Sequence, residues 1–486
     1  MEKNKNKRKK SFKKLLKYKT FRKRNIISLL SIITSIILII FLFIMNIFPI
    51  KYIVLITILI LGINCLGIIF MNIHKKTPIK IIGTIIIILS LIVNCIGIYY
   101  ISNTNNFMNK SFNKKILYNK NTYYVLSLKS NNLKESDITG TIATYKETVN
   151  LAEAIKQLNQ KYSLKEIEYD DLGTVFDQIN NNTNKIMLIE KSSYEIVFSI
   201  SEVLNKSDYD ILYEFDLYTK KKSSNNNLDK YNVFIGGTDF AGLMDFNMIA
   251  TINTKTREVL LTSIPRDYYI EVAGKNGRYD KLSFMNAYGN NVNKESLEKL
   301  FDTNIDYSII LNTNSLVNIV DYVGGIDFCS DYTFTTSHAL VTDTYNDKGK
   351  KLYVKKGCQH LNGVETLTVA RERNAFPGRD RVRQQNCQKI LISIVKKLIS
   401  TDTLLHYSET LNTINNTYET DITKKMILSI IKDTLENPNK WEITTQSVNG
   451  EDGHDKVHMT DLIDWVMYPD YNTVNSAKKQ INDTLK

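Results

Sequence analysis

Three long runs of uncharged, apolar residues near the N-terminus constrain this chain more than any other feature. They span residues 25–50, 52–73 and 81–101. Each run reaches the roughly 20 residues that a helix needs to cross a bilayer, and each is longer than the roughly 7–15 apolar residues of a cleaved signal peptide. So much uninterrupted Ile and Leu disfavours a buried hairpin of a soluble protein. We therefore expect three transmembrane helices within residues 26–101.

The basic residues that flank these runs predict their orientation. Residues 1–25 carry thirteen Lys and Arg against one acid, and so hold 12 of the 13 net positive charges of the chain. Three lysines lie between the second and third runs, but only one lies between the first and second. The positive-inside rule then places the tail and the second loop in the cytoplasm. We expect a multi-pass protein of the cell membrane with residues 102–486 outside.

The basic tail at residues 1–25 has two interpretations. Such a tail can bind DNA or RNA, in which case its affinity would depend strongly on salt. Here the charges lie directly beside the first apolar run, which is typical of a segment that sets topology and faces anionic lipid headgroups. We therefore expect membrane lipid as a partner and no nucleic acid.

The residues after the third apolar run divide by composition into three segments. Residues 102–120 are polar and rich in Asn, so we expect a stalk. Residues 121–228 alternate strand-like and amphipathic helical runs, and end in KKKSSNNNLDK, which has the composition of a linker. We expect a small α/β accessory domain at 121–228, with no catalytic constellation, and the catalytic domain at 229–486.

Strands and helices also alternate in the catalytic segment. YNVFIGG, NMIATIN, EVLLTSIP and YYIEV predict successive strands, and residues 382–399 predict a long amphipathic helix. Gly324 and Gly325 follow another predicted helix, in positions typical of a C-terminal cap. This alternation predicts an α/β fold, with a central sheet that carries helices on both faces.

Charged residues in this segment stand where predicted strands end and helices begin. A buried charge needs a partner, either in the protein or in a ligand. Arginine suits phosphate, because its guanidinium fork matches phosphate oxygens, and carboxylates suit Mg²⁺ bound to substrate phosphates. The clusters are Asp239 with Asp245, Arg266 with Asp267, Arg371 with Arg373, and Asp380 with Arg381 and Arg383. Together they predict a metal–diphosphate site, with Mg²⁺ or Mn²⁺ as cofactor.

Five ordered motifs resemble the LytR-CpsA-Psr family. They are LLTSIPRDYYIEV, DKLSFMNAYG, LVNIVDYVGGIDF, KKGCQHLNGVETLTVARER and GRDRVRQQNCQKIL, and WVMYPDYNTVNSAKKQI resembles the C-terminal end of that family. The resemblance covers about residues 231–486. The three-span anchor with an extra outer domain is similar to the streptococcal capsule-type members.

The resemblance implies a three-layer α-β-α sandwich with a central mixed sheet and a pocket for a polyprenyl tail. It implies an enzyme that transfers an anionic glycopolymer, either teichoic-acid-like or capsular, from undecaprenyl pyrophosphate to peptidoglycan through a phosphodiester link. The alternative is a regulatory membrane protein, similar to a transcriptional attenuator, that binds polyprenyl pyrophosphate without transferring anything.

The resemblance also assigns roles to individual residues. It implies that Asp239 and Asp245 bind the metal, and that a phosphate supplies the charge that Arg266 lacks. The chemistry of phosphoryl transfer adds two expectations beside the resemblance: Asp267 orients Arg266 or a substrate hydroxyl, or simply forms an ion pair with an arginine, and Asp380 is a candidate general base. We expect the clamping arginines to repel one another in an empty site. These arginines are Arg266, Arg371, Arg373 and Arg383, with Arg381 as a further candidate.

Three positions depart from the family pattern. Leu243 stands where the family has a clamping arginine, and Cys387 where it has a glutamine. Arg379 stands where the family has the second glycine of Gly-Gly-Asp. The candidates to replace the missing groups are Arg379, Arg381 and Gln384.

The five cysteines differ in their surroundings. Cys65 and Cys95 lie in the apolar runs, whereas the other three lie in the segment expected outside the cell, where thiols can oxidise. Cys387 falls inside the long predicted helix, so we expect it to be buried. We predict a disulfide between Cys329 and Cys358.

Overall fold

The chain divides into two compact units. One consists of residues 1–110 and 424–439, and the other of residues 111–423 and 440–486. The computed structural model describes residues 2–46, 48–73, 77–113, 118–220, 229–239, 243–289, 291–341, 346–398, 418–436 and 441–486. Most of the expected linker, residues 221–228, and two of the loop lysines, at positions 75 and 76, lie outside the described residues.

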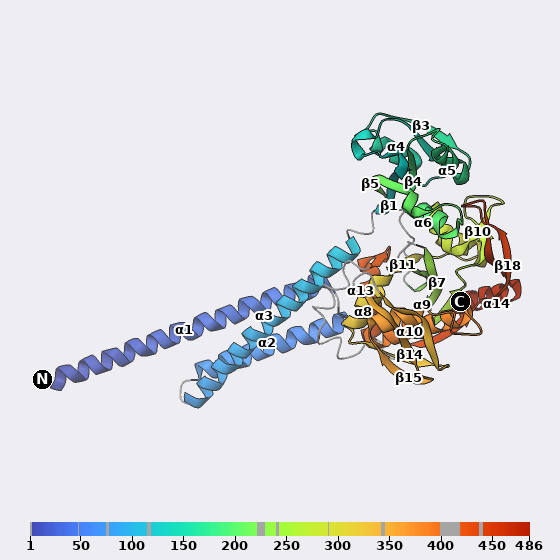
Figure 1. Cartoon of the computed structure of the whole chain (residues 1–486). Helices are drawn as coiled ribbons and strands as arrows, with labels where there is room; N and C mark the ends of the chain where they lie inside the picture. Colours follow the sequence, from blue (N-terminus) through green and yellow to red (C-terminus); the bar gives the residue numbers. More distant parts are fainter. Residues whose placement is uncertain are drawn as a thin grey trace. The chain divides into compact units, whose positions relative to one another are not determined.

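The first unit contains three long helices, α1 (Glu2–Met45), α2 (Ile50–Asn72) and α3 (Thr77–Asn113), which run side by side in Figure 1. Each includes a stretch long and apolar enough to cross a membrane, with a mean hydropathy between 2.7 and 3.0. Their outward Ile and Leu side chains are largely exposed, as expected of a surface that faces lipid. The expectation of a three-helix membrane anchor is therefore confirmed. The unit also includes α13 (Lys424–Glu436).

Polar side chains join the three anchor helices. Asn64 of α2 accepts a hydrogen bond from Ser31 at 2.7 Å, and it donates to Ser35 at 3.0 Å and to Ser90 of α3 at 3.2 Å. Asn94 of α3 donates to Ser35 at 2.8 Å. These groups are buried between the helices, where an unsatisfied amide would be costly. The network therefore fixes how the helices pack on one another.

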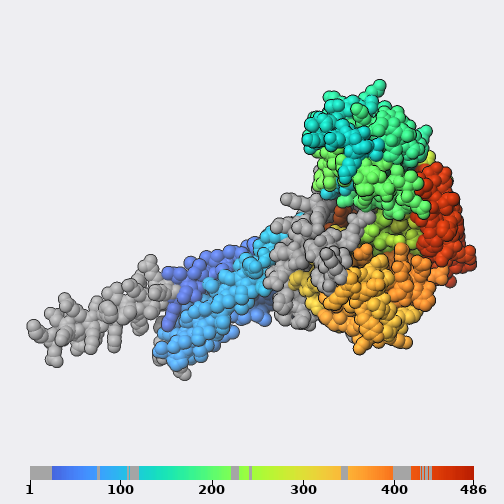
Figure 2. Space-filling model, in the orientation of Figure 1, coloured from blue at the N-terminus to red at the C-terminus, as the bar shows by residue number. Residues whose placement is uncertain are grey.

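In the second unit, residues 118–220 form an α/β fold that appears as a compact lobe in Figure 2. A five-stranded sheet has the order β3-β2-β4-β1-β5. The strand-like and helical runs expected in residues 121–228 correspond to β1, β4, α4 and α5, whereas strands β2, β3 and β5 were not predicted. The bounds are β1 (Tyr118–Leu128), β2 (Gly140–Tyr145), α4 (Leu151–Leu158), β3 (Leu164–Tyr169), α5 (Leu172–Asn180), β4 (Met187–Glu190), α6 (Lys191–Ile200) and β5 (Tyr209–Lys220), with short 3₁₀ turns at Lys129–Asn131, Glu135–Asp137 and Lys206–Asp208.

A six-stranded mixed sheet of order β16-β11-β6-β7-β8-β17 forms the centre of the rest of this unit. β11 runs parallel to β6, and β17 runs parallel to β8, whereas the other neighbours are antiparallel. The strands are β6 (Lys230–Thr238), β7 (Met244–Asn253), β8 (Glu258–Ile264), β11 (Tyr307–Asn312), β16 (Tyr418–Thr420) and β17 (Glu442–Ser447). The predicted strands β6, β7 and β8 are confirmed.

Helices cover both faces of this sheet. Neighbouring residues of a strand point to opposite sides, so two successive residues of β6 show what packs on each face. Phe234 of β6 packs in the core with Leu297 of α7 (Val292–Phe301), Ile481 of α14 (Tyr471–Thr484) and the 3₁₀ helix η4 (Leu282–Tyr288). The next residue, Ile235, faces a cavity lined by α8 (Thr313–Tyr322), α9 (Gly363–Arg371) and α10 (Asp380–Leu398). The expected three-layer α/β architecture is confirmed. In Figure 2 only a small part of the light-green strands β6 to β8 remains visible between these covering segments.

Four small two-stranded sheets complete the unit. One of them, the pair of β12 (Ile326–Ser330) and β15 (Gly357–Leu361), places Cys329 directly opposite Cys358, and the two form a disulfide. The predicted bridge is confirmed, and so is the burial of Cys387. The other pairs are β9 (Tyr269–Glu271) with β10 (Tyr279–Lys281), β13 (Phe334–Val341) with β14 (Asn346–Val354), and β18 (Gly450–Lys456) with β19 (Ile463–Pro469).

Candidate active site

An apolar cavity of about 110 Å³ lies between the central sheet and helices α8 to α10. Its lining is dominated by aliphatic side chains from both layers, such as Leu311, Leu367 and Ile390, which suit a hydrocarbon ligand. The same cavity is also lined by polar residues that the sequence singled out. These are Asp239, Asp245, Arg371, Arg383 and Cys387.

A second, polar cavity of about 380 Å³ is lined by the residues that follow β8 and by those that open α10. It contains the charged groups of Arg266, Asp267, Arg373 and Asp380. Further lining comes from Lys281 and from the hairpin of β18 and β19. The predicted site residues are therefore divided between two cavities, which the contacts described next connect.

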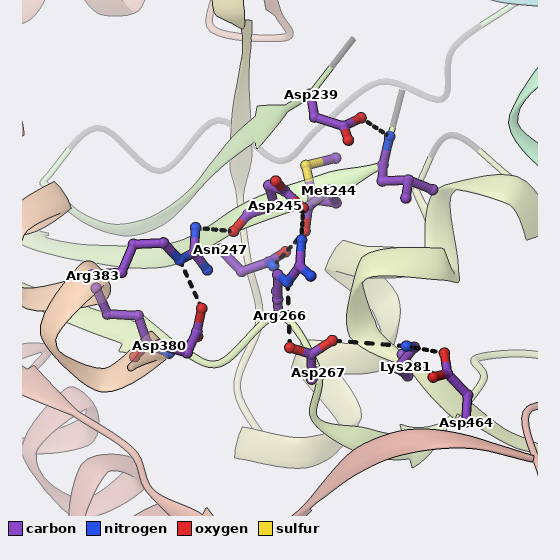
Figure 3. A network of polar contacts seen from close by, with 12 residues as sticks. Asp239, Met244, Asp245, Asn247, Arg266, Asp267, Lys281, Asp380, Arg383 and Asp464 are labelled. Carbon is purple, nitrogen blue, oxygen red and sulfur yellow. Dashed lines mark hydrogen bonds and ion pairs between the residues drawn. The ribbon is translucent and has the colours of Figure 1, made fainter. Parts of the chain in front are cut away.

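Arg266 contacts one residue from the lining of each cavity, and Figure 3 shows these two contacts. Its guanidinium makes an ion pair with Asp245, which lines the apolar cavity, and lies 3.3 Å from the carboxylate of Asp267, which lines the polar one. Burial lowers the pKa of Arg266, but the two carboxylates raise it by more than burial lowers it. The pKa of Arg266 is therefore above its ordinary value. The expectation that Arg266 lacks a partner is wrong. Its charge is already neutralised by Asp245, which is distant in sequence, and by the adjacent Asp267.

Asp267 is nearly inaccessible to solvent, with 4% of its side chain exposed. Burial raises the pKa of this carboxyl above its usual range, although Arg266 and Lys281 act against the rise. Of the two interpretations of Asp267, the ion pair with a neighbouring arginine is confirmed.

Arg383 ties the start of α10 to strand β7. Its Nε lies 2.7 Å from Asp380 Oδ1, and its Nη1 donates to the backbone carbonyl of Asp245 at 2.9 Å. Gln384 donates to the other carboxylate oxygen of Asp380 at 2.8 Å. Burial would raise the pKa of Asp380, but Arg383 and these hydrogen bonds lower it overall. The carboxylate of Asp380 therefore holds the side chain of Arg383 in position. It also accepts a hydrogen bond from Gln384.

Arg373 differs from its neighbours, because no side chain among the described residues forms an ion pair or hydrogen bond with its guanidinium. The residue is half-buried. Burial lowers its pKa, and the positive charges of Arg266 and Arg383 lower it further, although Asp267 and Asp380 act in the opposite direction. A cation held in such surroundings favours an anionic ligand, since the ligand supplies the charge that the protein does not.

The two candidate metal ligands both line the apolar cavity. Asp239 accepts a hydrogen bond from the backbone N–H of Leu243 at 2.8 Å, and Asp245 pairs with Arg266. Across the described part of the chain, no group of three or more His, Cys, Asp or Glu side chains is placed to hold a metal ion. Mg²⁺ is commonly held by one or two carboxylates together with substrate phosphates. The aspartate pair fits this minimal arrangement, with a bound phosphate as the remaining ligand.

The departures from the family pattern also have a place in the structure. Leu243 packs against the hydrophobic core and lines neither cavity. Cys387 lines the apolar cavity, and burial raises the pKa of its thiol to about 11. Arg379 and Arg381 are exposed in the polar cavity, and Arg381 donates to the carbonyl of Gly450 at 2.8 Å. Arg379 has a φ of 41°, in the left-handed region where glycine is favoured.

The sequence did not single out Lys281, although it lies within the motif DKLSFMNAYG. Its side chain is buried, pairs with Asp464 of β19 and lies 3.9 Å from Asp267 (Figure 3). A lysine directly before an apolar run was the available signal, because a charge that starts a buried element needs a partner. Its partner Asp464 is 183 residues away in sequence, so no local pattern indicates the pair.

Comparison with known proteins identifies relatives of this chain. A polyisoprenyl-teichoic acid–peptidoglycan teichoic acid transferase, TagU, from Bacillus cereus (strain AH820) is 30% identical over 219 residues, which are 44% of this chain and 68% of the relative. TagU from Bacillus mycoides is 26% identical over 302 residues, 60% of this chain and 90% of the relative. TagU from Enterococcus faecalis is 26% identical over 237 residues, 47% of this chain and 72% of the relative.

Solved structures also show similarity to this chain, at lower sequence identity. Protein gbs0355 from Streptococcus agalactiae is 24% identical, with a TM-score of 0.46, over 54% of this chain and 91% of its own. TagV from B. subtilis is 21% identical, with a TM-score of 0.44, over 53% of this chain and 98% of its own. The model of the LytR_cpsA_psr family matches residues 196–482, which is more than half of the chain. The chain is therefore a member of the LytR_cpsA_psr family.

Proposed function

We propose that this protein is a transferase that moves an anionic glycopolymer from a polyprenyl diphosphate carrier, with undecaprenyl as the polyprenyl group, onto peptidoglycan. The relatives described above are named as transferases of teichoic acid to peptidoglycan, and this chain spans more than two thirds of their length. The division of the site into an apolar and a polar cavity suits a donor that is hydrocarbon at one end and anionic in the middle.

Arg373 is the observation that carries this proposal. The described residues leave its guanidinium without a partner, while two further arginines, Arg266 and Arg383, reduce its pKa. A diphosphate between the cavities would balance this excess of positive charge. In this arrangement the aliphatic side chains of the apolar cavity take the polyprenyl chain, and Arg371, which lines that cavity, contacts the phosphate nearest to it.

In the proposed phosphoryl transfer, each of these residues has a separate role. A hydroxyl oxygen of the acceptor forms a bond to the phosphorus that carries the glycopolymer, and the bond from that phosphorus to the oxygen of the polyprenyl phosphate breaks. The products are a phosphodiester and polyprenyl phosphate. Arg373 and Arg266 stabilise the charge on the leaving phosphate. A divalent metal such as Mg²⁺ or Mn²⁺ at Asp239 and Asp245 would supply further charge neutralisation when bound.

We assign the acceptance of the hydroxyl proton to Asp267. Burial raises the pKa of this carboxyl, which makes its carboxylate a stronger base, and it lines the polar cavity. Asp380 suits this role less well, because Arg383 and Gln384 occupy its two oxygens and its pKa is lowered. Asp380 is therefore a positioning residue for Arg383.

The proposed reaction takes place on the outer side of the membrane. The positive-inside rule orients the three helices so that residues after 102 face outward. The disulfide between Cys329 and Cys358 favours the same side, since disulfides persist in oxidising compartments. A membrane-impermeant thiol reagent should label Ser130→Cys, an exposed position beyond the third membrane span, in intact cells. Labelling only after lysis would reverse the orientation.

The transferase proposal is tested on the full chain purified in nanodiscs. Mass spectrometry should detect polyprenyl diphosphate that copurifies with the protein. The purified protein should then release polyprenyl phosphate, and link polymer to peptidoglycan, when lipid-linked polymer and peptidoglycan are both present. Bound lipid without transfer would favour the regulatory alternative, and neither bound lipid nor transfer would contradict both.

A further inference from the structure

The hairpin of β18 and β19 forms a wall of the polar cavity that the proposed diphosphate site does not use. Four of its residues line this cavity: Asp452, Asp464, Trp465 and Met467. They lie in the same cavity as Arg266 and Arg373, the residues assigned to the phosphates. The cavity has a volume of about 380 Å³, within the range typical of sites for small organic ligands.

The register of the hairpin places three of these side chains on one face. Asp452 is directly opposite Met467, and His454 is directly opposite Trp465. Trp465 and Met467 are two residues apart on β19, so they point to the same side as Asp452. Trp465 is half-buried against the core, which holds its indole in place while part of it lines the cavity.

The charge on this wall differs from the charge near the proposed phosphates. Asp452 is exposed in the cavity, and Asp464 pairs with the buried Lys281. A wall with two carboxylates and no arginine of its own disfavours a polyanion. It suits a polar, uncharged ring instead, because carboxylates accept hydrogen bonds from hydroxyl or amide N–H groups, and an indole offers a flat apolar surface.

We propose that this wall is a carbohydrate subsite that holds a sugar ring of the acceptor glycan, with the ring against Trp465 and its hydrogen-bond donors on Asp452, which lies on the same face of the hairpin. This inference rests on the proposed function and names the position of its acceptor. A sugar in this place has its hydroxyl groups within the same cavity as Asp267, the residue assigned to accept the proton. The donor, with its phosphates, is held by the arginines on the other side.

The first test measures binding directly. The chain has only two tryptophans, and the other, Trp441, stacks against Arg257 and lines neither cavity. In full-length Trp441→Phe protein, emission therefore reports on Trp465 alone. We expect the soluble disaccharide of N-acetylglucosamine and N-acetylmuramic acid to change this emission saturably. Inorganic pyrophosphate, which is directed to the arginines, should not. No change with the disaccharide up to millimolar concentrations would overturn the proposal.

A second variant tests the hydrogen bonds of the subsite. Asp452→Asn removes an exposed carboxylate for which the structure gives no ion pair or hydrogen bond among the described residues, so the fold should not change. In the Trp441→Phe background we expect this substitution to weaken disaccharide binding several-fold. Equal affinity for the disaccharide would exclude Asp452 from the subsite.

The final test separates the acceptor from the sugar of the donor. Trp465→Ala should raise the KM for peptidoglycan about tenfold, equivalent to about 1.4 kcal/mol of binding free energy, and leave the KM for lipid-linked polymer unchanged. The control is Tyr468→Ala, which removes an aromatic ring from the same strand but from its opposite face. A rise in the KM for the donor instead would assign the subsite to the sugar of the donor and contradict the proposal. Absence of transfer by the unaltered protein would contradict the proposed function, while the fluorescence test would still decide on the subsite.

Discussion

Arg266 and Asp245 lie 21 residues apart in sequence and form an ion pair between an apolar and a polar cavity. Arg266 also contacts Asp267 on its other side, so arginines and aspartates alternate through this part of the site. The repulsion expected among the four arginines is therefore largely neutralised for Arg266 and for Arg383, which pairs with Asp380. It remains for Arg373.

Arg266→Ala should destabilise the fold as well as abolish transfer. The substitution leaves the buried Asp267 with Lys281, 3.9 Å away, as its nearest cation. Removal of one partner from a buried ion pair costs about 3–5 kcal/mol, and Lys281 should keep the loss near the lower end, about 3 kcal/mol. Denaturant unfolding of the purified protein measures this change. An Arg266→Ala protein as stable as the unaltered one would show that the pair with Asp267 contributes little.

Arg373→Ala should have the opposite effect on stability. It removes a half-buried cation that pairs with no described residue and that Arg266 and Arg383 repel, so the free energy of unfolding should stay the same or rise. Transfer should fall about ten- to a hundredfold, because a charge-assisted contact to the diphosphate is worth about 1.5–3 kcal/mol. Arg373→Lys is the matched control, which keeps the charge but loses the bidentate geometry, and it should retain partial activity. Normal activity of Arg373→Ala would contradict the role of this residue.

Arg379→Gly tests the cost of the left-handed backbone at this position. Arg379 has a φ of 41°, a conformation that costs most residues about 1–2 kcal/mol, and glycine adopts it freely. Since glycine also gains freedom in the unfolded chain, we expect a net stabilisation of about 1 kcal/mol at most. Asn132→Gly, at an exposed position with a φ of 49° in the accessory domain, is the control for stability without effect on activity. If Arg379→Gly also lowers transfer, its side chain contributes to the site.

The disulfide between Cys329 and Cys358 should stabilise the helix-covered face of the catalytic domain. It closes a segment with a sequence separation of 29, for which a loss of about 2–4 kcal/mol on removal is typical. Chemical unfolding of Cys329→Ser/Cys358→Ser protein measures that loss. Cys387→Ser should leave the bridge intact, and peptide mapping of exported protein should find Cys387 as the free thiol among the three. Free thiols at both 329 and 358 would contradict the pairing.

Glu190 should make the α/β fold of residues 118–220 less stable as the pH rises. Burial raises the pKa of this carboxyl to about 7, although the N–H groups of Ser192 and Ser193 at the start of α6 act against the rise. The unfolded chain loses this proton near pH 4.5, whereas the folded protein keeps it, so stability falls between about pH 4.5 and pH 7, by about 3 kcal/mol in all.

The substitution Glu190→Gln should flatten this pH dependence, because the amide oxygen still accepts the hydrogen bonds but does not ionise. The free energy of unfolding, followed from about pH 4.5 to about pH 8, measures the difference. The control is Asp171→Asn, which makes the same acid-to-amide change at the residue that caps α5 and should leave the pH dependence in place. Parallel pH profiles for Glu190→Gln and the unaltered protein would exclude Glu190 as the cause.

The sequence predicted well those features that depend on local pattern. Strands β6 to β8 and helix α10 repeat apolar residues with the periods of strands and helices, and the three apolar runs form α1 to α3. The bridge from Cys329 to Cys358 was predictable because the chain has few cysteines outside the apolar runs. The paired strands β13 to β15, β18 and β19 were missed. Of these, β14 and β18 are rich in Lys, Asp and Gly and therefore have the composition of a polar loop.

The partners of the charged residues could not be predicted from local pattern. Asp245, Arg266 and Arg383 were each indicated by a motif, but only the packing of β7, β8 and α10 decides which contacts which. For this reason Arg266, expected to lack a partner, is paired, while Arg373 is not. Lys281 and Asp464 belong to the same category, because their contact joins β10 to a hairpin near the other end of the chain.

The amides between the anchor helices have a consequence for how the protein is made. Asn64 finds Ser31 and Ser35 on the helix synthesised before it, so α1 and α2 can leave the translocation machinery as a pair. Asn94 belongs to the helix that is synthesised last, and it donates a hydrogen bond to Ser35 of the first helix. Ser90 of the same last helix accepts a hydrogen bond from Asn64. An asparagine alone in lipid would be poorly solvated. We therefore expect the anchor to insert sequentially, with each later helix stabilised in the bilayer by hydrogen bonds to the helices before it.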